Sequence, residues 1–214
     1  KGEESRHGDT VALISMDRYT ATTAGYPAKQ KSAECIYRGM QHFLGPQVKA
    51  DHVYSDNSKE IQKACEDLGF LPDTCTPYRS QTNGVAERAV RRISESTSSQ
   101  LMQSGFIEPW WSDAMTCTNA LLDVDLQLAD GQTSYEKRTG KTFEWLVIPF
   151  GAHIKYKPSS DDDRARTHSY GDKLLNGLFA GYYRVPGGGY NGDYYVVDWQ
   201  EREEAEVASE VYLK

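Results

Sequence analysis

Two carboxylate side chains lie at positions where they could share a metal ion. Asp56 ends a segment that suits a strand, so its side chain would leave the sheet at the strand's end. Glu87 lies in the first turn of a long predicted helix. Carboxylates are the hard oxygen ligands that Mg²⁺ takes together with water and phosphate oxygens. Two such ions can activate an attacking oxygen and stabilise a leaving one, so this pattern indicates phosphoryl transfer.

Arginines surround the second of these acids. Four arginines and one glutamate between Arg79 and Arg92 give this stretch a net charge of +3. Arg88 and Arg91 point away from the apolar side of the predicted helix, given about 100° of rotation per residue. Arginine forms strong, often paired hydrogen bonds with phosphate, so these side chains are candidates for contact with a nucleic-acid backbone.

Each of these signals also has an ordinary structural interpretation. An aspartate after a strand is commonly a turn residue or a helix N-cap. A glutamate in a first helical turn commonly complements the helix dipole. Exposed arginines are commonly solvated surface, so the residue types alone leave both interpretations open.

The elements that would position these residues follow from the apolar periodicity. Strands are predicted where β-branched and apolar residues run or alternate, and helices where apolar residues recur every three or four positions. The predicted strands are Val11–Met16, Thr20–Ala28, Val48–Asp56 and Phe70–Pro77. The predicted helices are Lys31–Leu44, Asn57–Leu68, Val85–Ser104 and a helix from about 109 to 124.

The long helix has a predicted buried side. This side comprises Ala86, Ala89, Val90, Ile93, Thr97 and Leu101. Glu87 lies at the edge of that arc, next to the buried face but not within it. The Asn83-Gly84 pair just before the helix predicts a turn.

The character of the chain changes near residue 130, where Gly, Pro, Tyr and Asp become frequent. Four strands are predicted in this second part: Ala152–Lys157, Gly177–Arg184, Asp193–Trp199 and Val207–Leu213. We therefore expect an α/β domain over 1–140 and a small all-β module with an acidic tail over 146–214.

Composition limits the function classes. The 214 residues are 38% hydrophobic and 11% aromatic, enough for a folded core. No apolar run approaches a membrane span, so no membrane partner is expected. The net charge of −7 counts against nucleic-acid binding, but residues 193–210 alone carry −6. Four scattered cysteines indicate reduced thiols in an intracellular protein rather than a zinc site: Cys35, Cys65, Cys75 and Cys117.

Two motifs carry a family resemblance. Tyr54-Ser55-Asp56-Asn57 is followed by TPYRSQTNGVAER, residues 76–88, and the second block is long and specific. Together they resemble the integrase core of copia-type retrotransposons, over roughly residues 11–140. Ile148-Pro149-Phe150-Gly151 and the strands at 177–182 and 194–198 resemble the SH3-like module that follows this core in copia-type polyproteins.

The resemblance implies a ribonuclease H-like fold, a mixed sheet flanked by helices. It implies metal-dependent joining of element DNA ends to target DNA, with Mg²⁺ or Mn²⁺ held by Asp56 and Glu87 as the second and third acids of a triad. Gln81 and Asn83 would lie beside the DNA, which Arg79, Arg88 and Arg91 would also contact. A homo-oligomer of the full-length protein and a nuclear location are implied as well.

The sequence departs from the family pattern at the first acid. That acid belongs on a first strand in the middle of the sheet, and neither Asp9 nor Asp17 lies on such a strand. Asp17 instead matches a turn residue. We therefore expect the first strand to be missing and the chain to be inactive by itself. Two alternatives remain: an inactive nucleic-acid-binding remnant, and a structural or protein-interaction module.

Overall fold

The chain begins with an antiparallel hairpin, as predicted. In the computed structural model, which describes residues 4–46, 48–56, 58–74 and 84–214, β1 (Val11–Met16) pairs with β2 (Thr23–Ala28). Helix α1 (Ala33–Leu44) follows and packs on this hairpin. Ser32 caps α1, because its side chain accepts a hydrogen bond from the backbone N–H of Cys35.

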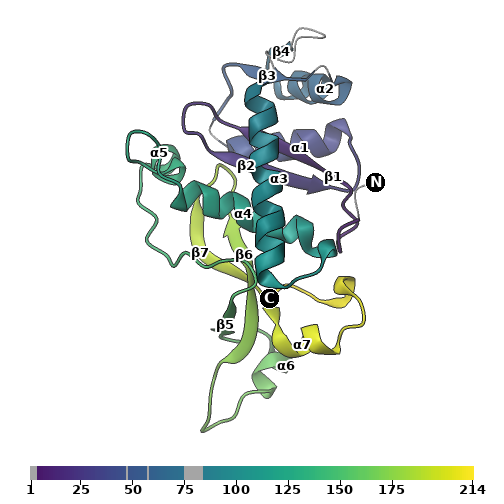
Figure 1. Ribbon diagram of the computed structural model, residues 1–214, viewed down its shortest axis with the longest axis vertical. Coiled ribbons are helices and arrows are strands. Elements are labelled where there is room, and N and C mark those ends of the chain that lie inside the picture. The colour runs from purple at the N-terminus through teal and green to yellow at the C-terminus, as the bar shows by residue number, and fades with distance from the viewer. Residues whose placement is uncertain (1–3, 47, 57, 75–83) are drawn as a thin grey trace.

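A second small sheet lies above the first (Figure 1). Strand β3 (Val53–Ser55) runs parallel to β4 (Pro72–Thr74), and α2 (Lys59–Leu68) connects them. Within the described residues no strand joins β1 to β3, so the two pairs form separate sheets. The absence of a first, central strand stays a prediction. Helix α1 packs on both α2 and the hairpin and so links the two sheets.

The long helix α3 (Gly84–Ser104) runs down the front of the molecule (Figure 1). Its buried stripe consists of Ala89, Ile93 and Thr97, spaced four residues apart. The prediction that Val90 belongs to this stripe is wrong, since its side chain is 47% exposed. One residue turns the helix by about 100°, which carries Val90 out of so narrow a contact.

Helix α4 lies at the centre of the fold. After η2 (Glu108–Trp110), α4 (Trp111–Asp125) packs against α3 on one side and against β2 and β6 on others. It is therefore buried on most of its surface. The short helix α5 (Ser134–Thr139) follows, with Thr133 and Glu136 forming a reciprocal capping box at its start.

The C-terminal part contains an antiparallel sheet in the order β5 (His153–Tyr156), β6 (Leu175–Arg184), β7 (Tyr190–Asp198). The prediction that it is all β is wrong, because it also contains α6 (Asp161–Ala165) and α7 (Trp199–Glu204). The predicted strand Val207–Leu213 is wrong as well. The chain there forms η3 (Ala208–Glu210), and only a single bridge joins Leu213 to Val197. The SH3-like character of this part stays a prediction.

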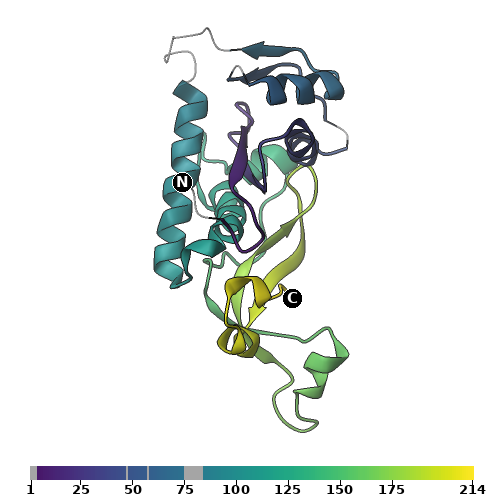
Figure 2. The ribbon, with the colours of Figure 1, turned by 90° about the vertical axis from the view of Figure 1, so that its right-hand side faces the viewer.

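One hydrophobic core crosses the expected boundary near residue 140. Phe106, Trp110 and Cys117, from η2 and α4 and the turn before them, pack with side chains of the C-terminal sheet and the chain end. Those side chains include Phe179, Tyr182, Val197 and Val211. Figure 2 shows β6 and β7 rising alongside α4 to reach the N-terminal part.

Two close backbone approaches fix the C-terminal part on the rest. Gly151 has a φ of +80°, and a Cβ there would lie 2.4 Å from the Cβ of Ser104 at the end of α3. Gly187, in the turn between β6 and β7, donates its N–H to the carbonyl of His42 in α1. A Cβ on Gly45 would lie 2.8 Å from the Cα of Gly187. Only glycine fits such contacts without displacing the backbone.

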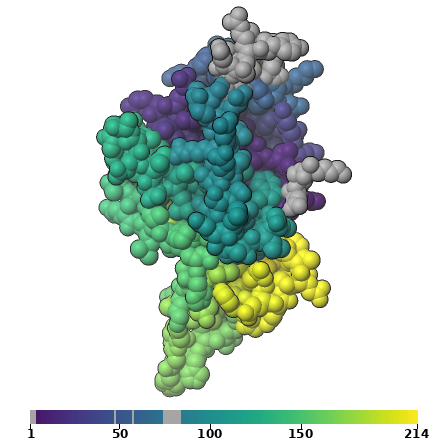
Figure 3. All heavy atoms as spheres, viewed as in Figure 1, coloured from purple at the N-terminus to yellow at the C-terminus, as the bar shows by residue number. Residues whose placement is uncertain are grey.

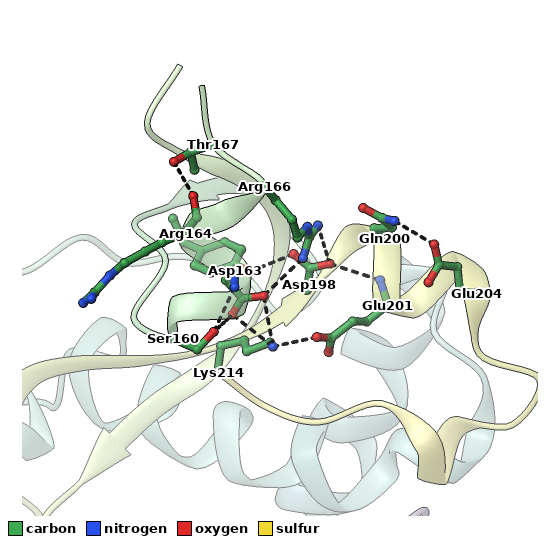
Figure 4. A network of polar contacts seen from close by, with 11 residues as sticks. Ser160, Asp163, Arg164, Arg166, Thr167, Asp198, Gln200, Glu201, Glu204 and Lys214 are labelled. Carbon is green, nitrogen blue, oxygen red and sulfur yellow. Dashed lines mark hydrogen bonds and ion pairs between the residues drawn. The ribbon is translucent and has the colours of Figure 1, made fainter. Parts of the chain in front are cut away.

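The last residues of the chain are part of the fold. Lys214 exchanges backbone hydrogen bonds of 3.2 and 2.8 Å with Val196. Its side chain forms ion pairs with Asp163 at 3.1 Å and Glu201 at 2.6 Å (Figure 4). Glu201, one of the acids of residues 193–210, and Asp163 of α6 therefore hold α6, α7 and the chain end together.

Candidate metal and nucleic-acid site

Asp56 immediately follows β3, as the sequence predicted, and its side chain is exposed. One carboxylate oxygen, Oδ1, accepts a hydrogen bond of 3.2 Å from the backbone N–H of Ser58, at the start of α2. This is the turn role that an aspartate at a helix start commonly has. Among the described residues, the other oxygen, Oδ2, has no hydrogen-bond partner.

Glu87 lies in the first turn of α3 and is exposed beside the buried Ala89. Its position at the rim of the buried stripe agrees with the helix geometry inferred from the sequence. The described residues provide no hydrogen bond or ion pair to its carboxylate, and none joins it to Asp56. The structure thus places the two acids on β3 and α3 as separate, accessible carboxylates.

The arginines of α3 also lie where the sequence predicted. Arg88 and Arg91 are exposed, and Arg92 is partly exposed. No acid of the described chain forms an ion pair with any of the three. Elsewhere arginines such as Arg6, Arg166 and Arg184 are paired with aspartates. The first half of α3 therefore presents uncompensated positive charge.

Three predicted site residues cannot be placed. Arg79, Gln81 and Asn83 lie outside the described residues. Asp9 and Asp17, the two candidates rejected as a first acid, are both engaged locally. Asp9 accepts a hydrogen bond from the Ser5 hydroxyl at 2.8 Å. Asp17 accepts from Tyr19 N–H and the Thr20 hydroxyl, which is the turn role expected of it.

The rest of the described chain offers no stronger metal site. It contains no group of three or more His, Cys, Asp or Glu side chains that could hold a metal ion. Cys35, Cys65 and Cys117 are free thiols. Burial raises the pKa of Cys117 and Cys65, so both thiols stay protonated and poor as ligands.

The buried acids that sequence reasoning did not single out are structural. Asp113 pairs with Arg6 at 2.7 Å, and Asp123 pairs with Arg184 at 2.8 Å. Burial raises the pKa of Asp123, while the neighbouring Arg184 opposes that change. Neither acid reaches the surface around β3 and α3. No periodic pattern in the sequence distinguishes such an acid from an exposed one.

The fold matches a known structure. An intasome of simian T-cell lymphotropic virus, in complex with the PP2A regulatory subunit B56γ, superposes with a TM-score of 0.51. The match covers 86% of this chain and 64% of that chain, at 13% sequence identity. The chain has an integrase-like fold. At this identity the likeness concerns the fold alone.

Two other solved structures resemble this chain at lower TM-scores. The catalytic core domain of BIV integrase gives a TM-score of 0.44 at 21% identity, covering 58% of this chain and 82% of that one. The HTLV-2 integrase catalytic core domain in complex with magnesium, in a trimeric form, gives 0.46 at 18% identity, covering 64% and 98%.

Sequence comparison adds a distant relative. No family model matches the chain. A Gag-Pol polyprotein of avian reticuloendotheliosis virus is 23% identical over 107 residues, 47% of this chain. That match spans 9% of the polyprotein, so the chain corresponds to a small part of it. In the described residues no helix is both long and apolar enough to cross a membrane.

Proposed function

We propose that this chain is the integrase-like part of a polyprotein that acts in DNA integration, of copia type as the sequence motifs suggest. In this proposal Asp56 and Glu87 bind a divalent metal ion. Arg88 and Arg91 contact the phosphates of DNA, together with Arg79, Gln81 and Asn83 from the preceding segment. The integrase-like fold, with a free carboxylate after β3 and another at the start of α3, is the observation that carries it.

The donor set fits Mg²⁺ or Mn²⁺ in its chemistry. Both proposed ligands are carboxylates with an oxygen open to solvent, and neither is held in an ion pair with a described residue. A bound divalent ion would stabilise charge on the phosphoryl oxygens. The protein's own contribution would be to hold Asp56 at the end of β3, where its bond to Ser58 fixes the side chain. Two carboxylates bind such an ion weakly, so we expect little or no joining activity from this chain alone.

The arginines provide the means of holding DNA. Each phosphate neutralised by an arginine releases counterions, so binding weakens in a predictable way as salt rises. We propose that the DNA backbone lies along the first half of α3. A homo-oligomer would then be needed to hold two element ends and target DNA together.

DNA affinity tests this proposal. Fluorescence anisotropy with a short duplex should show binding that weakens with salt. In the R88E/R91E variant, affinity should fall and the slope of log K against log salt should decrease by about 2. The matched control K141E/K173E changes the net charge equally at exposed positions outside α3 and should bind like the unchanged protein. Equal loss in both variants would show that only total charge matters.

Metal binding is tested separately. Mg²⁺ or Mn²⁺ should raise the melting temperature, because a ligand that binds only the folded state stabilises it. The D56N and E87Q variants should lose most of that rise, whereas D51N, an exposed aspartate near β3, should keep it. An undiminished metal response in D56N would rule out the proposed pair.

One observation favours a second candidate function, a DNA-binding remnant without activity. Among the described residues, no group of three or more His, Cys, Asp or Glu side chains could hold a metal ion. Salt-dependent DNA binding without any metal-dependent rise in melting temperature would favour this candidate.

A further inference from the structure

A groove of about 470 Å³ lies away from the proposed metal site, between α3, α4 and the segment that leads into β5. Its volume is in the range of sites that bind ligands or side chains of a partner. α3 contributes Glu95 and Ser99, four residues apart, and α4 contributes Leu121 and Asp125 with the same spacing. Each helix therefore turns one continuous stripe toward the groove.

The floor and one wall of the groove are apolar. Leu121 and Leu122 of α4 line the groove together with Val147 and Pro149. Val147 is 50% exposed, and its neighbour Leu146 is 73% exposed. Residues 144–147 form no strand or helix and are exposed throughout. Figure 3 shows the face of the molecule on which α3 lies beside the green residues that follow it in sequence. Apolar side chains gathered at a groove indicate a surface that another apolar group would cover.

The charged groups of the groove are all acidic. Glu95 on α3 and Asp125 on α4 line it, and no Lys, Arg or His of the described residues does. Both acids are exposed, and neither forms an ion pair with any residue in the described ranges. The groove therefore has two uncompensated negative charges beside an apolar floor.

Polar oxygens in the walls also lack donors. Gln100 Oε1 and Thr118 Oγ1, both on residues that line the groove, are buried without a hydrogen-bond partner among the described residues. The side chain of Thr118 is fully buried. A buried amide oxygen is normally satisfied, and only a donor can satisfy it. Because these two oxygens are enclosed, the exposed acids and the apolar lining decide the occupant, which should carry positive charge and apolar surface.

We propose that this groove binds an arginine side chain presented by an apolar segment of a partner protein. The guanidinium group is planar and carries five donors, so one group can serve carboxylates on both helices. Its aliphatic stem covers apolar surface while the charged end stays at the rim. Apolar residues on either side of the arginine would cover Leu122 and Val147. The proposal does not depend on DNA or metal binding, and the groove begins at Glu95, one helical turn after the proposed DNA contact Arg91.

Methyl NMR titration with a blocked peptide, Ac-Leu-Arg-Leu-NH2, tests this site. The leucine and valine methyl signals of Leu121, Leu122 and Val147 should shift, and Ac-Leu-Glu-Leu-NH2 should bind about threefold to tenfold more weakly. E95Q/D125N should weaken the arginine peptide by a similar factor. E203Q/E206Q, which removes the same charge from exposed positions near α7, should leave its affinity unchanged.

A substitution within the groove gives a second readout. V147R places an arginine of the chain's own at a half-exposed wall position, where it would occupy the acidic site and exclude the peptide. An unchanged affinity in V147R, or equal binding of the two peptides, would overturn the proposal. If n-butylguanidinium bound as tightly as the arginine peptide, the proposal would also be overturned, because the leucines beside the arginine would then contribute nothing to the affinity. Self-association of the protein that V147R abolishes would instead identify a second copy as the occupant.

Discussion

Arg6 joins three parts of the chain through a single side chain. Its guanidinium pairs with Asp113 at 2.7 Å and donates to the carbonyl of Val211 at 2.6 Å. It also lies 4.1 Å from the ring centre of Trp110. The side chain is only 3% exposed, so the charge is fully enclosed by its partners. The N-terminal residues, α4 and the chain end are therefore coupled through one residue.

We expect R6A to destabilise the protein by about 3 kcal/mol, because it leaves the buried Asp113 without its main charge partner. The measurement is urea unfolding followed by circular dichroism. R38A is the control: Arg38 pairs with Glu34 on the exposed side of α1, and its loss should cost less than about 0.5 kcal/mol. Similar losses in the two variants would contradict the buried junction.

Asp198 is a second enclosed charge, at the end of β7 (Figure 4). It is fully buried and accepts hydrogen bonds from the Tyr156 hydroxyl at 2.7 Å and from Arg166 at 3.0 Å. Burial alone raises the pKa of an aspartate, but these hydrogen bonds outweigh it and hold the pKa of Asp198 below its ordinary value. The folded state therefore favours the ionised form.

A lowered pKa in the folded state predicts a direction of pH dependence. The stabilisation by Asp198 is complete above its unfolded pKa of about 4 and is lost as the pH falls through the folded value. Thermal unfolding between pH 7 and pH 3 should show this loss. D198N should be less stable at pH 7 and should lose less on acidification. If D198N lost as much stability on acidification as the unchanged protein, the loss would come from other acids. Asp113 and Asp163 are candidates, because their pKa values are also lowered.

At the scale of elements, the pair β3–β4 is the least supported part of the fold. It comprises three residues on each strand, in parallel, and α2 connects it to the rest mainly through α1. Two-stranded sheets are marginal alone, and parallel pairs are slightly weaker than antiparallel ones. The proposed ligand Asp56 is attached directly to this pair.

Hydrogen exchange followed by mass spectrometry measures this difference. Peptides covering 53–74 should exchange faster than peptides covering β6 and β7, because a local opening of the small sheet exposes little of the shared core. Mg²⁺ should slow the exchange near Asp56 if the metal proposal holds. Equal protection of the two regions would show that the small sheet opens only with the whole molecule.

How far the sequence predicted each element depended on local signals. Helix α3 was predicted to within one residue, since Asn83-Gly84 and Gly105 mark its ends. The strand expected at Val207–Leu213 was wrong because Glu210 accepts the N–H groups of Glu206 and Val207. A side chain that bonds the nearby backbone replaces a strand ladder. The alternation of apolar and polar residues there reflects the burial of Val211 and not a strand.

Two short helices were missed although their start signals were present. Ser160 with Asp163, and Asp198 with Glu201, have the spacing of N-caps. The side chains of Ser160 and Asp198 do accept the expected backbone N–H groups. Of the candidate site, the exposure of Asp56, Glu87 and the α3 arginines followed from helix and strand geometry. The groove did not, because it depends on how α3, α4 and a loop from later in the chain pack together.

At the scale of the whole molecule, the shared core predicts that the two expected domains depend on each other. Trp110 and Cys117 are fully buried in one cluster with Phe179 and Val197 from the C-terminal sheet. We expect the fragment 1–145 alone to lack a cooperative thermal transition and to bind a hydrophobic dye. Co-expression with 146–214 should restore a folded pair that purifies together. Cooperative unfolding of 1–145 alone would establish it as an independent domain.

The contact between Gly151 and Ser104 fixes the C-terminal end of α3, so the number of residues in the helix sets the position of Glu87 at its other end. Seventeen residues separate Glu87 from Ser104, a length of about 26 Å along the axis. Because the C-terminal part anchors one end, the reach of the other end is set by residue count. Deleting one residue from α3 would shorten that reach by about 1.5 Å and turn Glu87 by about 100°. The position of Glu87 therefore depends on the length of α3, whichever side chains the helix carries between its two ends.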